Sequence, residues 1–140
     1  MTARRFLAVA VGGVVGTWIR WGVGAEFPVA TGTFPVTTFA INMVGAACIG
    51  IVVVLTLDRR PPRPVLHSLL GTGVLGGLTT FSAFSVEAVE LVRTGSSGVA
   101  ALYVVASIVV GVALAWTSVA VTRHVVGVDR WMDADPEAPT

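Results

Sequence analysis

Charged residues are scarce in this chain. They make up 12% of its 140 residues, whereas hydrophobic residues make up 54%; a soluble domain usually carries about 25% charged residues. The formal net charge is +1, so the chain lacks the basic surface that nucleic-acid binding requires. The composition therefore indicates an integral membrane protein of one domain, and it excludes nucleic acid as a partner.

Cysteine is almost absent too, because Cys48 is the only one and no disulfide can form within the chain. The two histidines, His67 and His124, lie far from any cluster of cysteines or acids with metal-ligand spacing. The sequence also has no phosphate-binding loop and no nucleophile elbow. These absences predict that the protein is not an enzyme.

Long apolar runs are what the chain does contain. A helix needs about 20 apolar residues to cross the hydrocarbon core of a bilayer, and four segments are long enough. We therefore predict an all-α integral membrane protein, with a four-helix transmembrane unit over residues 1–124 and a polar, disordered tail over residues 125–140. The predicted transmembrane helices cover residues 6–23, 35–57, 65–92 and 99–121.

One stretch of the third predicted helix is unlike a lipid-facing helix. Residues 73–84, GVLGGLTTFSAF, hold three glycines, a Thr-Thr pair and two phenylalanines three residues apart. Glycines followed by two threonines predict a break in the helix near residues 76–80, which frees backbone carbonyls. A freed carbonyl is costly in a membrane unless protein, water or an ion meets it. The stretch is either an ion or substrate site, or a helix crossing built on small residues.

The first two helices carry small and polar residues. Two of the polar ones, Arg20 and Asn42, each allow two interpretations. Gly12 and Gly16 form a close-packing face. Arg20, near the predicted helix end, is either a snorkelling anchor or a cation that lines an aqueous entrance. Asn42 either joins two helices or donates its amide hydrogens to an anion.

The other two helices carry fewer such residues. Tyr103, Ser107 and Gly111 recur at four-residue steps on the fourth helix, as an interhelical contact or as a pore lining. Glu87 lies deep in the third helix, where the sequence assigns it no role.

Together these residues resemble the Fluc-type (CrcB) fluoride channels. The resemblance covers all four helices and is strongest over residues 73–84. Thr17, Trp21 and Thr37 depart from the family pattern, outside this central stretch. The other matching residues are Gly12, Gly13, Gly16 and Arg20 on the first helix, Thr38, Asn42, Gly45 and Gly50 on the second, and Tyr103, Ser107 and Gly111 on the fourth.

The resemblance implies a function as well as a fold. The subunit would pair as an antiparallel dimer in the bilayer of a bacterial inner membrane and export fluoride passively, lowering its toxicity. Asn42 would line the fluoride path as a hydrogen-bond donor, with Phe81 and Phe84 presenting their ring edges to the anion. Tyr103 and Ser107 would help to line the pore.

Two further roles follow from the resemblance. Arg20 would lie beside a vestibule. The backbone carbonyls of Gly76 and Thr79, from both subunits, would hold a structural sodium ion at the centre of the dimer. Oxygen-only ligation suits a hard cation, and the ion would add a fixed positive charge near the path.

Two other functions compete with this reading. A small proton-coupled drug exporter also has four helices, but it needs a membrane-embedded acid to exchange protons, and the first two predicted helices contain none. A membrane scaffold without transport activity would explain the glycine faces, but not the Thr-Thr-Phe-Ser-Ala-Phe run.

The arginines are distributed unevenly along the chain. Four helices place both termini and the second linker on one side, and under the positive-inside rule that side is cytoplasmic. An antiparallel homodimer requires a weak bias, so the pair is either a dual-topology homodimer or a dimer with a homologous subunit of opposite orientation. The side with the termini carries Arg4, Arg5, Arg59, Arg60, Arg63, Arg123 and Arg130, against Arg20 and Arg93 on the other.

We predict a fixed orientation with both termini in the cytoplasm. A reporter that is active only in the cytoplasm, fused to the C-terminus, should give a full signal in cells. The same reporter inserted after Gly95 in the third linker should give none. Substantial signal from both fusions would show that copies insert both ways.

Overall fold

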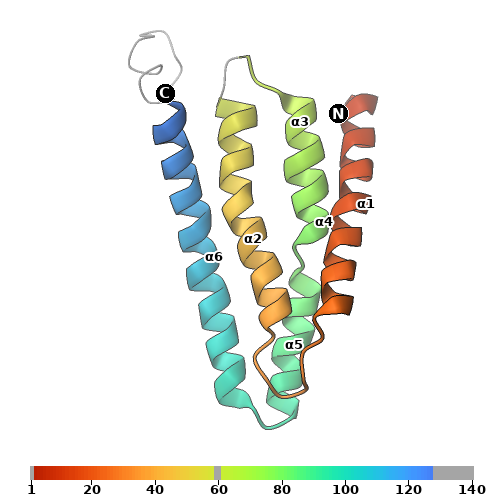
Figure 1. The fold of residues 1–140 in the computed structure, drawn as a ribbon, viewed down its shortest axis with the longest axis vertical. Helices are drawn as coiled ribbons and strands as arrows, with labels where there is room; N and C mark the ends of the chain where they lie inside the picture. Colours follow the sequence, from red (N-terminus) through yellow and green to blue (C-terminus); the bar gives the residue numbers. More distant parts are fainter. Residues whose placement is uncertain (1, 59–60, 128–140) are drawn as a thin grey trace.

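The computed structural model describes residues 2–58 and 61–127. Within these ranges, four helices are long and apolar enough to cross a membrane, and they lie side by side (Figure 1). This confirms the predicted all-α, four-helix architecture. The antiparallel dimer stays a prediction.

Two of the four spans are interrupted by irregular segments. The first span is α1 (Ala3–Glu26), and the last is α6 (Ser97–Val126). The second is α2 (Val36–Val53), continued by the π-helical segment η1 (Val54–Asp58). The third consists of α3 (Pro64–His67), the π-helical segment η2 (Ser68–Leu75), α4 (Gly76–Leu78) and α5 (Phe81–Arg93).

The helix ends follow local signals. Pro64 occupies the first turn of α3, where its missing N–H costs nothing. Gly127 ends α6 in the left-handed conformation, with φ 71°. Because α6 runs to Val126, the first residues of the predicted tail are helical. Residues 128–140 of that tail lie outside the described part of the chain.

The predicted break in the third span is confirmed. Thr79 (φ −75°, ψ 153°) and Thr80 (φ −145°, ψ 121°) are extended, whereas Gly76 keeps helical angles. The β-branched threonines therefore leave the helix, and the glycines do not. The Thr80 hydroxyl then caps α5, because Ala83 N–H donates to it at 3.1 Å.

The first helix packs directly against the backbone of the third span. A Cβ atom on Gly12 would collide with the carbonyl oxygen of Leu69, and one on Gly16 with that of Val74. Gly77, across the interface, has no room for a Cβ either. The predicted close-packing face on α1 is confirmed, and it brings α1 against η2 and α4, the segments before the break.

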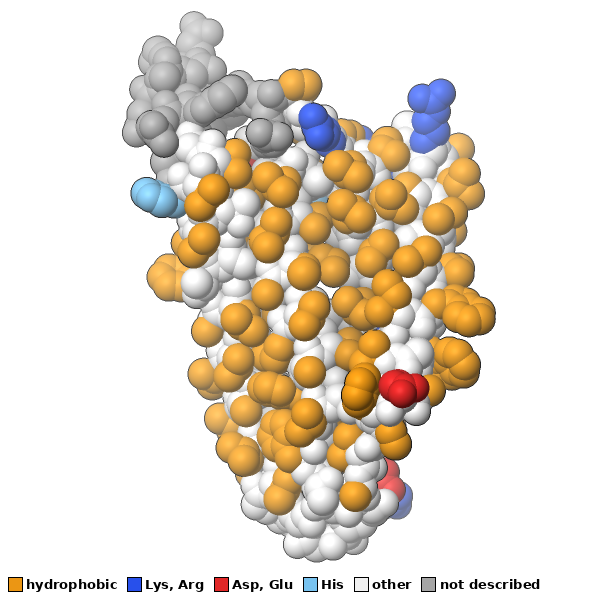
Figure 2. Space-filling view, in the orientation of Figure 1, with side chains coloured by type: hydrophobic (Ala, Val, Ile, Leu, Met, Phe, Trp, Pro, Cys, Tyr) orange, Lys and Arg blue, Asp and Glu red, His pale blue; other side chains and the backbone are white. Residues whose placement is uncertain are grey.

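Side-chain contacts join neighbouring spans at the end of the bundle that carries both termini. The Thr56 hydroxyl lies 3.0 Å from His67 Nδ1, and Arg123 Nε donates to Asp58 at 2.8 Å. His67 is therefore a contact between the second and third spans. Figure 2 shows basic side chains at this end and hydrophobic side chains over the middle of the visible face. Arg59, Arg60 and Arg130 lie outside the described residues.

The glycine interface gives a matched test of packing. We expect Gly16→Ala to destabilise the folded protein by about 1–3 kcal/mol, because overpacking against the backbone cannot relax by side-chain movement. Gly13→Ala is the control, since a Cβ atom there meets nothing within 4 Å. Thermal unfolding in detergent measures both. Equal midpoints for the two variants would contradict the interface.

Candidate functional site

A groove opens on one face of the bundle, between α2, the broken span and α6. It brings together side chains and backbone from three spans that are far apart in the sequence. Tyr103 and Arg20 do not border it. The predicted site residues that line the groove are Asn42, Gly76, Thr79, Phe81, Phe84 and Ser107.

Asn42 holds the broken backbone from the α2 side. Its Nδ2 donates to the Thr80 carbonyl at 3.1 Å, and the Thr80 N–H donates to its Oδ1 at 2.9 Å. This pair of hydrogen bonds joins two helices, as one of the two interpretations of Asn42 proposed. A primary amide has two N–H donors, so one remains for a second partner. The other interpretation, donation to an anion, stays a prediction.

The break leaves backbone carbonyls without their usual helical donors. The Thr80 N–H, four residues after Gly76, goes to Asn42, and the Ala83 N–H, four residues after Thr79, goes to the Thr80 hydroxyl. A Cβ atom on Gly76 would meet nothing within 4 Å, so the chain is open to an outside partner here. In the described part of the chain, no group of three or more His, Cys, Asp or Glu side chains is placed to hold a metal. The structural sodium ion predicted on the Gly76 and Thr79 carbonyls stays a prediction.

Arg20 reaches the same break from the opposite side. Its Nε–H donates to the Gly77 carbonyl at 3.2 Å. Arg20 thus lies beside the middle of the third span rather than at its edge. α1 ends at Glu26, a little beyond the predicted end at Val23, and the predicted place of Arg20 beside a vestibule stays a prediction.

Aromatic rings extend from the groove into the bundle. Phe81 is 80% exposed, and its ring centroid lies 5.7 Å from that of Phe84. Phe84 in turn lies 5.1 Å from Tyr103, which is completely buried, and Tyr103 makes an edge contact with Phe34 at 5.3 Å. Tyr103 therefore lies one layer behind the groove, and its predicted place on a pore stays a prediction.

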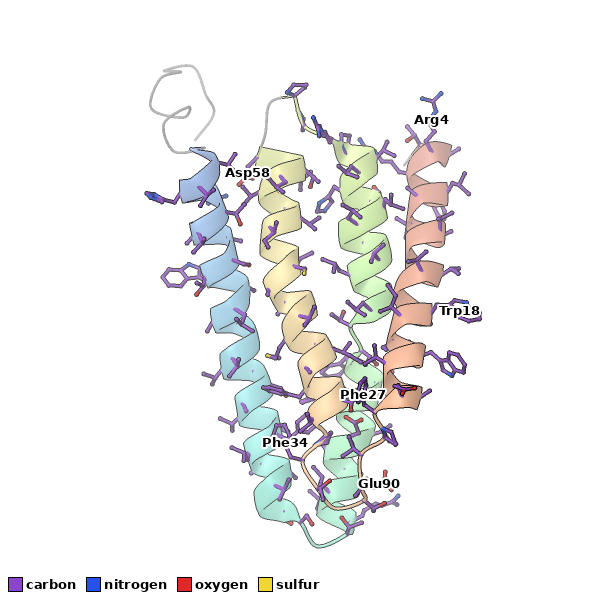
Figure 3. The ribbon with its side chains drawn as sticks, in the orientation of Figure 1. Arg4, Trp18, Phe27, Phe34, Asp58 and Glu90 are labelled. Carbon is purple, nitrogen blue, oxygen red and sulfur yellow. The ribbon has the colours of Figure 1, made fainter. Side chains whose placement is uncertain are left out.

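Glu87 joins three spans, a role that the sequence did not assign to it. Its Oε2 accepts a hydrogen bond from the Tyr103 hydroxyl at 2.7 Å, and its Oε1 accepts one from the Thr38 hydroxyl at 2.6 Å. It also lines a second pocket, beneath the loop between α1 and α2. Figure 3 shows Phe27, Phe34 and Glu90 around this end of the bundle. The signal in the sequence was an acid within an apolar helix, which needs hydroxyl or amide donors on the facing helices.

Comparison with known proteins places the chain among small membrane proteins. Residues 7–119 match the family described as CrcB-like protein, Camphor Resistance (CrcB). The fluoride-specific ion channel FluC of Novosphingobium aromaticivorans is 43% identical over 128 residues, which cover 89% of this chain and 99% of that protein. The FluC of Agrobacterium fabrum is 41% identical over 117 residues, covering 83% and 94% respectively. The match to the family runs from α1 into α6.

We expect Tyr103→Phe and Thr38→Val each to lower the free energy of unfolding by about 1–3 kcal/mol, because each leaves one Glu87 oxygen without its donor. Thr94→Ala is the control, as it removes an exposed hydroxyl that bonds only to nearby carbonyls. Thermal unfolding in lipid nanodiscs measures all three. If the three variants unfold together with the wild type, Glu87 does not join the spans.

Proposed function

The chain belongs to the CrcB-like protein family, and on that premise we propose that it is a fluoride-specific ion channel. It carries fluoride passively out of the cytoplasm and lowers its toxicity. The observation that supports this proposal is the groove in which Asn42, Phe81, Phe84 and Ser107 converge. The relatives are named as ion channels and not as enzymes.

The side chains of the groove suit a small, strongly hydrated anion. Removing water from fluoride is expensive, so donors must replace that water. The second N–H of Asn42 and the Ser107 hydroxyl are such donors. The rings of Phe81 and Phe84 carry positive charge at their edges, so they attract an anion without the strong binding that would prevent its exit.

Tyr103 and Arg20 extend the proposed path beyond the groove. Tyr103 contacts Phe84 on one side, and its hydroxyl reaches Glu87 beside the second pocket. Arg20 supplies a positive charge beside the break. Within residues 2–58 and 61–127 no carboxylate lies at ion-pair distance from it, so its charge acts on an approaching anion.

A sodium ion fits the open side of the break. The carbonyls of Gly76 and Thr79 would hold it, because both residues border the groove and the helical donors of both carbonyls are turned elsewhere. Oxygen ligands suit a hard cation. When bound, the ion supplies a fixed positive charge and satisfies the freed backbone.

We propose that the groove is half of a shared site and that the channel is an antiparallel dimer. Phe81 is 80% exposed, and a Cβ atom on Gly76 would find open space; a second subunit would cover both. The partner is either another copy or a homologous subunit inserted the opposite way, as the arginine distribution favours. Both termini of this chain would lie in the cytoplasm.

Ion release from liposomes tests the function. Liposomes that hold the protein, with a partner subunit if one is required, are loaded with potassium fluoride or potassium chloride. An ionophore supplies the path for the counter-ion, and ion-selective electrodes follow each anion. We expect fluoride to leave and chloride to remain. Equal release of both anions, or proton-coupled uptake of organic cations, would refute the proposal.

The groove residues are tested in the same assay. Phe81→Ile and Phe84→Ile keep most of the apolar volume but lose the ring edge, so fluoride flux should fall about three- to tenfold. Asn42→Asp should reduce it further, because a carboxylate repels the anion. Phe6→Ile is the control, since Phe6 is 68% exposed on the outer face of α1. Wild-type flux in all the groove variants would remove these residues from the path.

A further inference from the structure

Arg20 is placed to act on the broken backbone itself. Its Nε–H donates to the Gly77 carbonyl at 3.2 Å, in a partly buried contact between residues 57 positions apart in the chain. The close packing of Gly16 against the third span brings α1 near enough for this contact. In Figure 3 the labelled Trp18, two residues before Arg20, lies on α1 near the level of the break.

The carbonyl that Arg20 contacts is one that the break displaces. Gly77 lies four residues before Phe81, which begins α5, and the extended pair Thr79 and Thr80 separates the two. In an unbroken helix the Phe81 N–H would donate to the Gly77 carbonyl. Here the two residues belong to different helical segments, and the first N–H groups of a helix have no partner within it. A guanidinium N–H makes a charge-assisted hydrogen bond to a carbonyl, which is stronger than a neutral one.

Side chains from two neighbouring helices thus bind the backbone around the break. Arg20 on α1 binds the Gly77 carbonyl, and Asn42 on α2 binds both the N–H and the carbonyl of Thr80. The two residues that these side chains bind, Gly77 and Thr80, lie on either side of Thr79 in the sequence. Thr79 and Gly76 line the groove.

We propose that Arg20 is a positioning residue: its Nε–H fixes the Gly77 carbonyl toward α1 and so keeps the Gly76 and Thr79 carbonyls turned toward the groove. The consequence for transport rests on the proposed fluoride channel, whereas the consequence for the backbone does not. The role belongs to one N–H group of the side chain, and it is separable from the positive charge.

Three substitutions separate the donor from the charge. In Arg20→Gln the amide nitrogen is as many bonds from Cα as Nε is in arginine, so the donor stays and the charge is lost. Arg20→Lys keeps the charge but puts a methylene group at the Nε position. Arg20→Met removes both the donor and the charge, and its unbranched side chain ends as many bonds from Cα as Nε does in arginine.

Hydrogen–deuterium exchange in nanodiscs measures the backbone directly. In Arg20→Met, a peptide covering residues 76–83 should exchange about tenfold faster than in the wild type, as loss of one charge-assisted hydrogen bond implies. A reference peptide from α6, residues 105–115, should not change. Arg20→Gln should stay close to the wild type over residues 76–83. If Arg20→Met does not fold, Arg20→Lys replaces it, and its exchange should exceed that of Arg20→Gln.

The anion selectivity of flux gives the second readout. Arg20→Gln should keep the fluoride-to-chloride ratio of the wild type even if its absolute rate falls, and Arg20→Met should lose it. The inference is wrong if Arg20→Gln exchanges as fast as Arg20→Met, or if Arg20→Met is as protected as the wild type. Wild-type protein that shows no fluoride-selective release refutes the proposed function, while the exchange result still decides the role of Arg20.

Discussion

Backbone groups freed inside a membrane must find partners, and this constraint organises the molecule. A helix satisfies its own N–H and carbonyl groups, and hydrocarbon offers no substitute when it is interrupted. The third span is interrupted at Thr79 and Thr80, in the middle of the bundle. Each of the other three spans then either donates a hydrogen bond to the interrupted backbone or lines the groove beside it. Arg20 comes from α1, Asn42 comes from α2, and α6 closes the groove beside them with Ser107.

Glycine makes that repair possible because it brings helices close enough for side chains to reach a neighbouring backbone. Gly12 and Gly16 allow α1 to touch the third span through main-chain atoms alone. Without that approach, Arg20 would not reach Gly77. Small residues in membrane helices are usually explained by packing; here the same packing also sets the position of a hydrogen-bond donor. Residues 73–84 were interpreted either as a helix crossing built on small residues or as an ion or substrate site. The packing makes these two interpretations compatible.

The sequence predicted the four spans and the break because apolar length and Gly–Thr chemistry are local signals. It predicted six groove residues through the family resemblance, and the structure brings these together. It did not predict which atoms meet. The Asn42 pairing with Thr80 and the Glu87 contacts to Thr38 and Tyr103 depend on the rotation of helices about their axes, which sequence spacing alone does not define. Nor did it predict the contact between Arg20 and the Gly77 carbonyl, which depends on how α1 packs against the third span.

Glu87 is a partly buried acid close to the proposed anion path, and its contacts show what holds it in place. Glu87 lies in the third span, yet both its oxygens accept hydrogen bonds from hydroxyl groups. A carboxylate with two strong donors is stabilised in place, and it fixes the hydroxyl of Tyr103, which does not line the groove. The ring of Tyr103 then supports Phe84 from behind, at 5.1 Å. Tyr103 thus links Glu87 to Phe84, and Glu87 itself is not among the residues that line the groove. In the proposed channel, the groups that an anion would meet in the groove are therefore the Phe84 ring and the Asn42 amide rather than the acid.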